Sequence, residues 1–187
     1  MNFANAFTPE KLQEAWQMFL SDFPQALWDT VYVTVLATLF AIIIGLPLGM
    51  VLVSGDAKGI RPLPKPLMKF LNVLINLLRS IPFLILIVRV IPLTRLIVGT
   101  SVGTVASIVP LVVAAFPFVA RLVESSLREV NPNIIETAQS MGATPMQIMM
   151  HVMLPESVPS LINNFTLAIT TILGYTAMSG AIGGGGL

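Results

Sequence analysis

Long apolar runs without a charged residue dominate this chain. Three such runs occupy residues 30–55, 96–120 and 157–187. Each is long enough to cross a bilayer as an α-helix, which needs about 20 predominantly apolar residues. Since backbone polar groups within hydrocarbon must be satisfied inside the protein, these runs predict membrane-spanning helices.

A fourth apolar segment, residues 70–94, carries two positive charges, Arg79 and Arg89. It is longer than one span, so two arrangements stay open: an amphipathic helix at about 65–79 followed by a span from Ser80, or a single tilted helix. The pattern predicts an all-α integral membrane protein, a polytopic helix bundle. Its expected spans are about 30–54, 70–94, 98–120 and 157–183.

The first 28 residues have a different pattern from the rest of the chain. Thr8 is a suitable N-cap, and Trp16 and Phe19 recur at helical spacing among polar residues. Residues 1–28 are therefore expected to form an amphipathic helix at the membrane surface. Residues 29–187 are expected to form the transmembrane domain.

Positive charges are distributed unevenly between the expected loops. Residues 54–69 hold four Lys or Arg residues, whereas Lys11 is the only one in 1–29. Cytoplasmic loops of membrane proteins carry the excess of Lys and Arg. We therefore expect 54–69 and the long loop 121–156 to face the cytoplasm, with the N-terminus outside.

Composition excludes several other classes of protein. Of the 187 residues, 55% are hydrophobic and only 10% are charged, and the formal net charge is +1. These values argue against a soluble domain and against binding of nucleic acid. The absence of cysteine and the single histidine exclude disulfides, a cysteine nucleophile and a multi-histidine metal site. No Lys-Ser/Thr follows the glycine-rich end, so that end is not a phosphate-binding loop, and we expect no enzyme.

The loop 121–156 is patterned as two short helices. Asn131 is a suitable N-cap, and Gly142 follows the first helical segment as a C-terminal glycine does. Thr144 and Gln147 have the spacing of a capping box for a second helix. The sequence therefore predicts a helix, a glycine turn and a second helix.

The two predicted loop helices carry an apolar stripe that we expect to be exposed, with Pro155 ending the second helix. Its residues are Ile134, Ile135, Ala138, Met141, Met146, Met149, Met150 and Met153. One interpretation is that the hairpin packs into the bundle itself. The other is that it fits a groove on a cytoplasmic partner. Periodicity alone does not separate the two.

The same loop resembles a motif of ABC importer permeases, the EAA loop. Its spacing is E-x-A-x3-G-x9-V-x-L-P, with Thr at the position of the central Ala. The matching residues are Glu136, Ala138, Gly142, Val152, Leu154 and Pro155. Three further segments, 78–82, 98–103 and 174–180, are similar to amino-acid permeases and to the methionine-uptake branch in particular. The resemblance covers nearly the whole chain from about residue 25.

This resemblance implies a type I importer permease in a bacterial inner membrane that forms the translocation pathway as a homodimer. Two copies of a cytoplasmic ABC ATPase would bind ATP and Mg²⁺, so no cofactor is expected on this chain. A periplasmic or lipoprotein binding protein would deliver the substrate, most closely methionine. The EAA loop would be the coupling helix that docks on the ATPase. The family carries five spans, so a fifth is expected to be missing after Leu187.

Three other residues are candidates for function within the membrane. Arg79 is an ionisable residue in an apolar segment, which indicates function by default, although an arginine at a helix end also reaches the headgroups. Tyr175 and Met178 lie in the most polar of the spans and are candidates for the substrate pathway. The alternative functions are a truncated or inactive permease fragment, or a small carrier that works alone.

Overall fold

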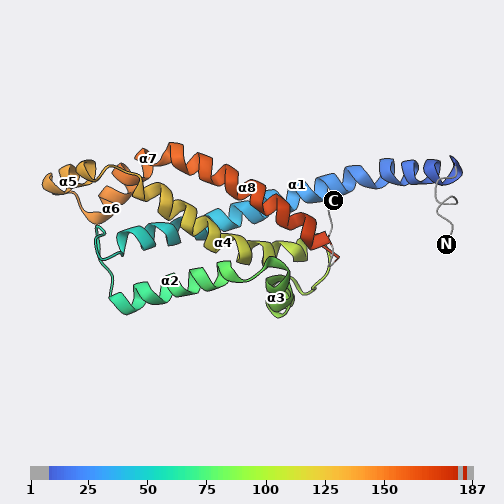
Figure 1. Ribbon diagram of the computed structural model, residues 1–187, viewed down its shortest axis with the longest axis horizontal. Helices are drawn as coiled ribbons and strands as arrows, with labels where there is room; N and C mark the ends of the chain where they lie inside the picture. Colours follow the sequence, from blue (N-terminus) through green and yellow to red (C-terminus); the bar gives the residue numbers. More distant parts are fainter. Residues whose placement is uncertain (1–8, 181–182, 185–187) are drawn as a thin grey trace.

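The computed structural model describes residues 9–180 and 183–184 as a chain of helices (Figure 1). In chain order these are α1 (Pro9–Ser54), α2 (Lys65–Ser80), α3 (Phe83–Val98), α4 (Thr104–Arg128), α5 (Pro132–Ser140), α6 (Pro145–Ile148), the π-helical turn η2 (Met149–Met153), α7 (Leu154–Glu156) and α8 (Val158–Gly180). Thr8, the expected N-cap, lies outside the described residues, as do 181 and 182 near the end of the last expected span. The expected all-α membrane bundle is confirmed.

The first helix is continuous through the expected boundary near residue 28. Residues 25–44 contain neither Gly nor Pro, so nothing in this stretch ends a helix. The surface helix and the first span that we expected are therefore one helix, α1, and its N-terminal part extends beyond the other helices (Figure 1). On that extension the rings of Trp16 and Phe19 stack at 5.8 Å between centroids, and those of Phe19 and Phe23 at 4.7 Å.

The interrupted segment 70–94 is two helices rather than one. α2 and α3 meet at an angle of 112°. Ile81 is extended between them, with φ −79° and ψ 124°, because the residue before a proline avoids the helical conformation. The chain therefore bends sharply between two helices here, and the single tilted helix that we had left open does not occur.

α4 is the centre of the bundle. α1 and α8 pack against it, and α2 and α3 lie beside it (Figure 1). The fully buried core comes mainly from α1, α4 and α8. It includes Ala37, Ala41, Leu111, Ala115, Val119, Ala168 and Ile172. At the end of the bundle away from α5, the Thr104 hydroxyl donates a hydrogen bond of 3.2 Å to Asp29, which joins the start of α4 to α1.

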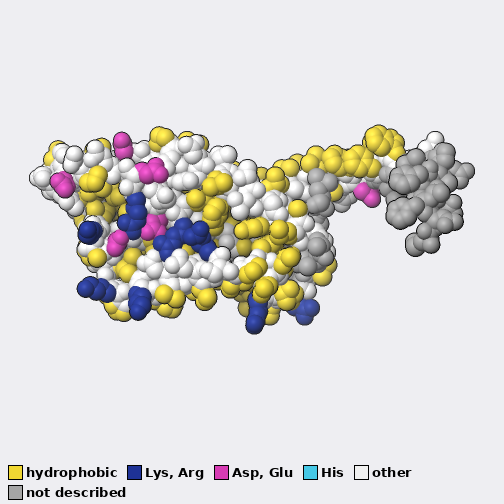
Figure 2. Space-filling model, in the orientation of Figure 1, with side chains coloured by type: hydrophobic (Ala, Val, Ile, Leu, Met, Phe, Trp, Pro, Cys, Tyr) yellow, Lys and Arg dark blue, Asp and Glu magenta, His cyan; other side chains and the backbone are white. Residues whose placement is uncertain are grey.

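The outer surface is suited to a bilayer. Among the described residues, three helices are long and apolar enough to span a membrane, and the number is four if the bent pair of α2 and α3 counts as one span. Large apolar side chains cover the outside, and charged side chains gather at the end that carries α5 and α6 (Figure 2). Separation of charge to one end of an apolar bundle supports the expected orientation of the loops.

Candidate coupling site

The predicted helix–glycine–helix hairpin is present at one end of the bundle. The Asn131 side chain accepts a hydrogen bond of 3.0 Å from the Asn133 N–H, which caps α5. Gly142 has a φ of 80°, a conformation that costs glycine little and other residues more. α6 begins with the predicted capping box: the Thr144 N–H donates to the Gln147 side chain, and the Gln147 N–H donates to the Thr144 hydroxyl. The sequence interpretation of the hairpin is confirmed.

Pro155 does not end the second helix, and that prediction is wrong. The chain passes from α6 into η2, where the Leu154 N–H donates to the carbonyl of Met149, five residues earlier. It then continues through Pro155 into α7 and reaches α8. A proline ring clashes with the carbonyl four residues before it, and a wider π-helical turn directly ahead of it relieves that clash. The hairpin is thereby joined to α8 by almost continuous helix.

Only part of the predicted apolar stripe is exposed. Met149 and Met153 are 4% and 3% exposed, respectively, and belong to the core of the bundle. Met141, Met146 and Met150 are exposed, the first two by 82% and 68%. One face of the hairpin therefore packs into the bundle, and the opposite face leaves methionine side chains exposed.

The residues of the EAA spacing take different positions. Glu136 is exposed, and Ala138 is half-buried against the core, where its carbonyl accepts a hydrogen bond of 3.1 Å from the Ala143 N–H. Leu154 is half-buried at the base of the hairpin, and Pro155 is exposed. The motif thus combines exposed residues, Glu136 and Pro155, with half-buried residues, Ala138 and Leu154.

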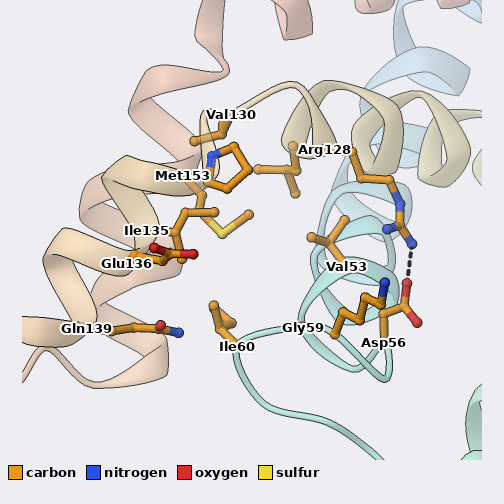
Figure 3. Close-up of a pocket in the computed structure, with 13 residues that line it drawn as sticks. Val53, Asp56, Gly59, Ile60, Arg128, Val130, Ile135, Glu136, Gln139 and Met153 are labelled. Carbon is orange, nitrogen blue, oxygen red and sulfur yellow. Dashed lines mark hydrogen bonds and ion pairs between the residues drawn. The ribbon is translucent and has the colours of Figure 1, made fainter.

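A cleft of about 500 Å³ lies under α5. Figure 3 shows its walls: Glu136 and Gln139 on α5 face Ile60 and Gly59 of the α1–α2 loop, with Arg128 and Asp56 beyond them. Lys58 also lines the cleft, so both signs of charge surround it. The cleft therefore separates α5 from the α1–α2 loop, with apolar side chains in its walls as well as charged ones.

A network of charged residues at the end of α4 was missed by the sequence analysis. The Glu124 carboxylate, on a residue only 9% exposed, accepts hydrogen bonds from both Arg121 and Arg128. Arg128 also donates to Asp56 at 2.8 Å. By its charged neighbours in the sequence alone, Glu124 would be taken for part of a solvated face, yet it is buried. The signal in the sequence was the spacing of Arg121, Glu124 and Arg128, which places all three on one face of a helix that enters the membrane.

Asp56 lies in the α1–α2 loop and is held in its charged form. Hydrogen bonds from the Arg128 guanidinium and from the Ala57 N–H, together with the charges of Arg128 and Lys58, lower the pKa of Asp56. The loop is thereby attached to the end of α4 by an ion pair that stays formed at neutral pH.

With this geometry in hand, comparison with known proteins identifies the family. The family model described as the binding-protein-dependent transport system inner membrane component matches residues 42–187. The chain belongs to this family. It is a multi-pass inner-membrane permease component of an ABC transporter, as the resemblance implied, and the ATPase activity of such a transporter is on a partner subunit.

Several relatives carry more specific names. The chain is 48% identical over 162 residues to the probable D-methionine transport system permease protein MetI of Vibrio cholerae. This match covers 87% of the chain and 72% of that relative. The chain is also 47% identical over 156 residues to the D-methionine transport system permease protein MetI of Escherichia coli K12. This match covers 83% of the chain and 71% of that relative.

Solved structures show the same fold. One describes inward-facing conformations of the MetNI methionine ABC transporter; it aligns with a TM-score of 0.87 at 44% identity, over 90% of this chain and 77% of that one. An amino acid ABC transporter crystallised with histidines aligns with a TM-score of 0.72 at 20% identity, over 90% of this chain and 75% of that one, and shares the fold.

The candidate pathway residues are only partly brought together. The Tyr175 ring stacks on Phe83 with centroids 4.6 Å apart, and the Arg79 guanidinium lies 5.9 Å from the centroid of the Phe118 ring. All four line a cleft of about 240 Å³ beside the break between α2 and α3. Met178 is exposed and does not line this cleft.

Some polar residues of the last span serve packing. The Asn164 amide donates to the Ser126 hydroxyl at 2.7 Å and to the Leu122 carbonyl at 3.3 Å. The Ser160 hydroxyl also donates to Ser126, at 3.1 Å. These bonds join α8 to α4 inside the bundle, as polar side chains commonly do between membrane helices.

Proposed function

We propose that this chain forms, as a homodimer, the translocation pathway of an ATP-driven methionine importer. The family supplies the transport function, and the relatives named for D-methionine transport and the solved methionine transporter indicate the substrate. As a permease component the chain needs no cofactor of its own. ATP and Mg²⁺ bind to two copies of the ATPase partner, and a periplasmic or lipoprotein binding protein delivers the substrate.

The hairpin carries the proposal, because it has the properties of a docking element. It projects from the charged end of the bundle, its two helices are capped, and the side chains of Met141, Met146 and Met150 are exposed (Figure 1). Exposed methionines suit adaptable apolar contacts, and a short helix seated in a groove is a common mode of recognition. We infer that α5 and α6 dock in a groove of the ATPase.

The direct connection of the hairpin to the bundle supports a mechanical role. At one end it follows α4 after a short link, and at the other it continues through η2 and α7 into α8. A movement imposed on the hairpin by closure of the ATPase dimer would therefore pull on two spans at once. In this proposal Glu136 contacts the ATPase, Ala138, Leu154 and Pro155 hold the hairpin, and Gly142 sets the angle between its helices.

We further propose that the cleft beside the α2–α3 break belongs to the pathway. Arg79 supplies a positive charge there, and Tyr175 an aromatic surface with a hydroxyl group. An amino acid carries a carboxylate that a guanidinium binds well. Met178, one helical turn beyond Tyr175, is proposed as a flexible side chain that seals the pathway.

The proposal is tested with the complete transporter in proteoliposomes, by measuring ATP hydrolysis and methionine uptake together. Gly142→Pro places a residue restricted to a φ near −65° where the chain needs 80°. Glu136→Lys reverses the charge of an exposed side chain on the side of α5 that faces the cleft. We expect both variants to insert and hydrolyse ATP but to lose uptake. Glu129→Lys is the matched control, since Glu129 is exposed just before the hairpin and outside it. Wild-type uptake in both hairpin variants would refute the coupling role.

A further inference from the structure

α2 buries little apolar surface of its own. Ile75 is its one buried residue, and its large apolar side chains Phe70, Val73 and Leu77 are 62%, 56% and 59% exposed, respectively. It lies at the edge of the bundle beside α4 (Figure 1). Among the described residues, the side-chain hydrogen bonds that join α2 to another helix are those from Arg121, described next.

Arg121 on α4 holds α2 at two successive turns. Its guanidinium donates to the side-chain oxygen of Asn72 at 2.8 Å and to that of Asn76 at 3.0 Å. The other terminal nitrogen of the same guanidinium donates to Glu124, which is buried. Hydrogen bonds from a charged donor are among the stronger polar contacts in proteins, and Glu124 fixes the direction in which the guanidinium points.

Glu124 connects this contact to the region of the hairpin. It also accepts hydrogen bonds of 2.9 and 3.1 Å from Arg128, which is in the last turn of α4. The hairpin begins at Pro132, after a link whose Val130 is buried. Arg128 in turn donates to Asp56, whose loop leads directly into α2 (Figure 3). The end of α4 therefore holds both the loop ahead of α2 and the middle of α2.

We propose that Arg121, oriented by Glu124, is the positioning residue through which movement of the hairpin reaches α2. A displacement of α5 moves the last turns of α4 through the covalent link between the two helices. Arg121 then transmits this movement to α2, and Arg128 transmits it to the α1–α2 loop. Because α2 has little buried apolar surface to hold it in place, it moves together with Arg121 and Arg128. Its far end is the bend at Ile81, where Arg79 and Phe83 line the cleft described above. The inference rests on the proposed function and assigns to α2 the movement that opens that cleft.

The first test removes both acceptors of Arg121 in the complete transporter. We expect Asn72→Ala/Asn76→Ala to lower methionine uptake by about tenfold or more, since two hydrogen bonds from a charged donor are lost, while ATP hydrolysis keeps its wild-type rate. Asn72→Ala/Asn76→Asp restores one strong acceptor and is expected to recover uptake. Gln25→Ala is the control, because Gln25 is an exposed amide on α1, away from the network.

A second measurement follows the movement itself. The chain has no cysteine, so Ser80→Cys places a single thiol at the exposed end of α2. In the otherwise wild-type transporter we expect its rate of reaction with a maleimide to change when ATP is added. In the Asn72→Ala/Asn76→Ala background we expect that change to disappear, with the ATPase still bound in equal amount.

The outcomes separate the inference from the proposed function. Wild-type uptake in the double alanine variant would overturn the inference, as would a labelling rate at position 80 that ATP leaves unchanged in the wild-type background. Equal loss of uptake and hydrolysis, or loss of the ATPase from the complex, would mean that the contacts maintain the fold and would also overturn it. An unmodified transporter that hydrolyses ATP without moving methionine would refute the proposed function, and the inference with it.

Discussion

A close contact between α1 and α4 offers a quantitative test of the packing. Gly45 and Gly49, one helical turn apart on α1, face Val119 and Val123 of α4. A Cβ added at Gly49 would lie 2.6 Å from the Val123 Cβ and 2.7 Å from the Ala120 carbonyl oxygen. Carbon atoms in contact are about 3.5–4.0 Å apart, so Gly49→Ala forces the two helices apart by about 1 Å. Neither the Cβ nor the carbonyl oxygen can move by a change of rotamer.

The size of the effect follows from two opposing contributions. Overpacking of a filled core costs about 1–3 kcal/mol. Replacement of glycine by alanine inside a helix returns about 0.5–1 kcal/mol in helix propensity. Gly174→Ala on α8 provides the matched control, since a Cβ there meets no heavy atom of the protomer within 4 Å. The two variants share the gain in propensity, so the difference between them isolates the overpacking, which we expect to be about 1–3 kcal/mol.

Reversible unfolding of the purified protein in mixed micelles, followed by circular dichroism at increasing fractions of denaturing detergent, measures both free energies of unfolding. Gly49→Ala is expected to unfold at a lower fraction than Gly174→Ala, and Gly45→Ala to resemble Gly49→Ala. Equal free energies of unfolding for Gly49→Ala and Gly174→Ala, to within about 0.5 kcal/mol, would refute the close packing of α1 on α4.

Two further predictions concern the loop and the pathway. The pKa of Asp56 is lowered in the folded chain by Arg128 and Ala57, so its contribution to stability is present above the ordinary carboxyl pKa and is lost as the pH falls through the lowered value. The difference in stability between wild type and Asp56→Asn is therefore expected to persist from pH 7 to about pH 4 and to shrink below it; denaturation at several pH values measures this, and a difference already lost near pH 6 would contradict it. Met178→Ala is expected to raise the passive leak of methionine into liposomes without ATP, and an unchanged leak and uptake would remove Met178 from the pathway.

The helices and the hairpin could be predicted because their signals are local. A charge-free apolar run has one stable arrangement in a bilayer, whatever lies beside it. Asn131, Gly142 and the pair Thr144 and Gln147 act on the backbone within a few residues, so their spacing was sufficient to place the turns of the hairpin.

The errors came where the backbone path or the packing of neighbouring helices overrides the usual preference of a residue. Pro155 is an ordinary helix breaker in sequence, yet the π-helical turn before it lets the helix continue. Glu124 has the local pattern of a solvated charge, but it is buried and accepts hydrogen bonds from Arg121 and Arg128, and Arg121 is in turn bonded to α2. Met149 and Met146 have similar spacing in the stripe, although only Met146 is exposed.

Local features of the amino-acid sequence were enough to predict a membrane bundle of helices with a capped hairpin, because hydrophobicity, helix caps and a glycine turn act between residues that are close along the chain. The fold was needed to see that Arg121 reaches Asn72 and Asn76, that Arg79 and Tyr175 share a cleft, and which face of the hairpin is buried. Those facts depend on the angle and register at which separate helices pack, and the shape of many side chains together sets both.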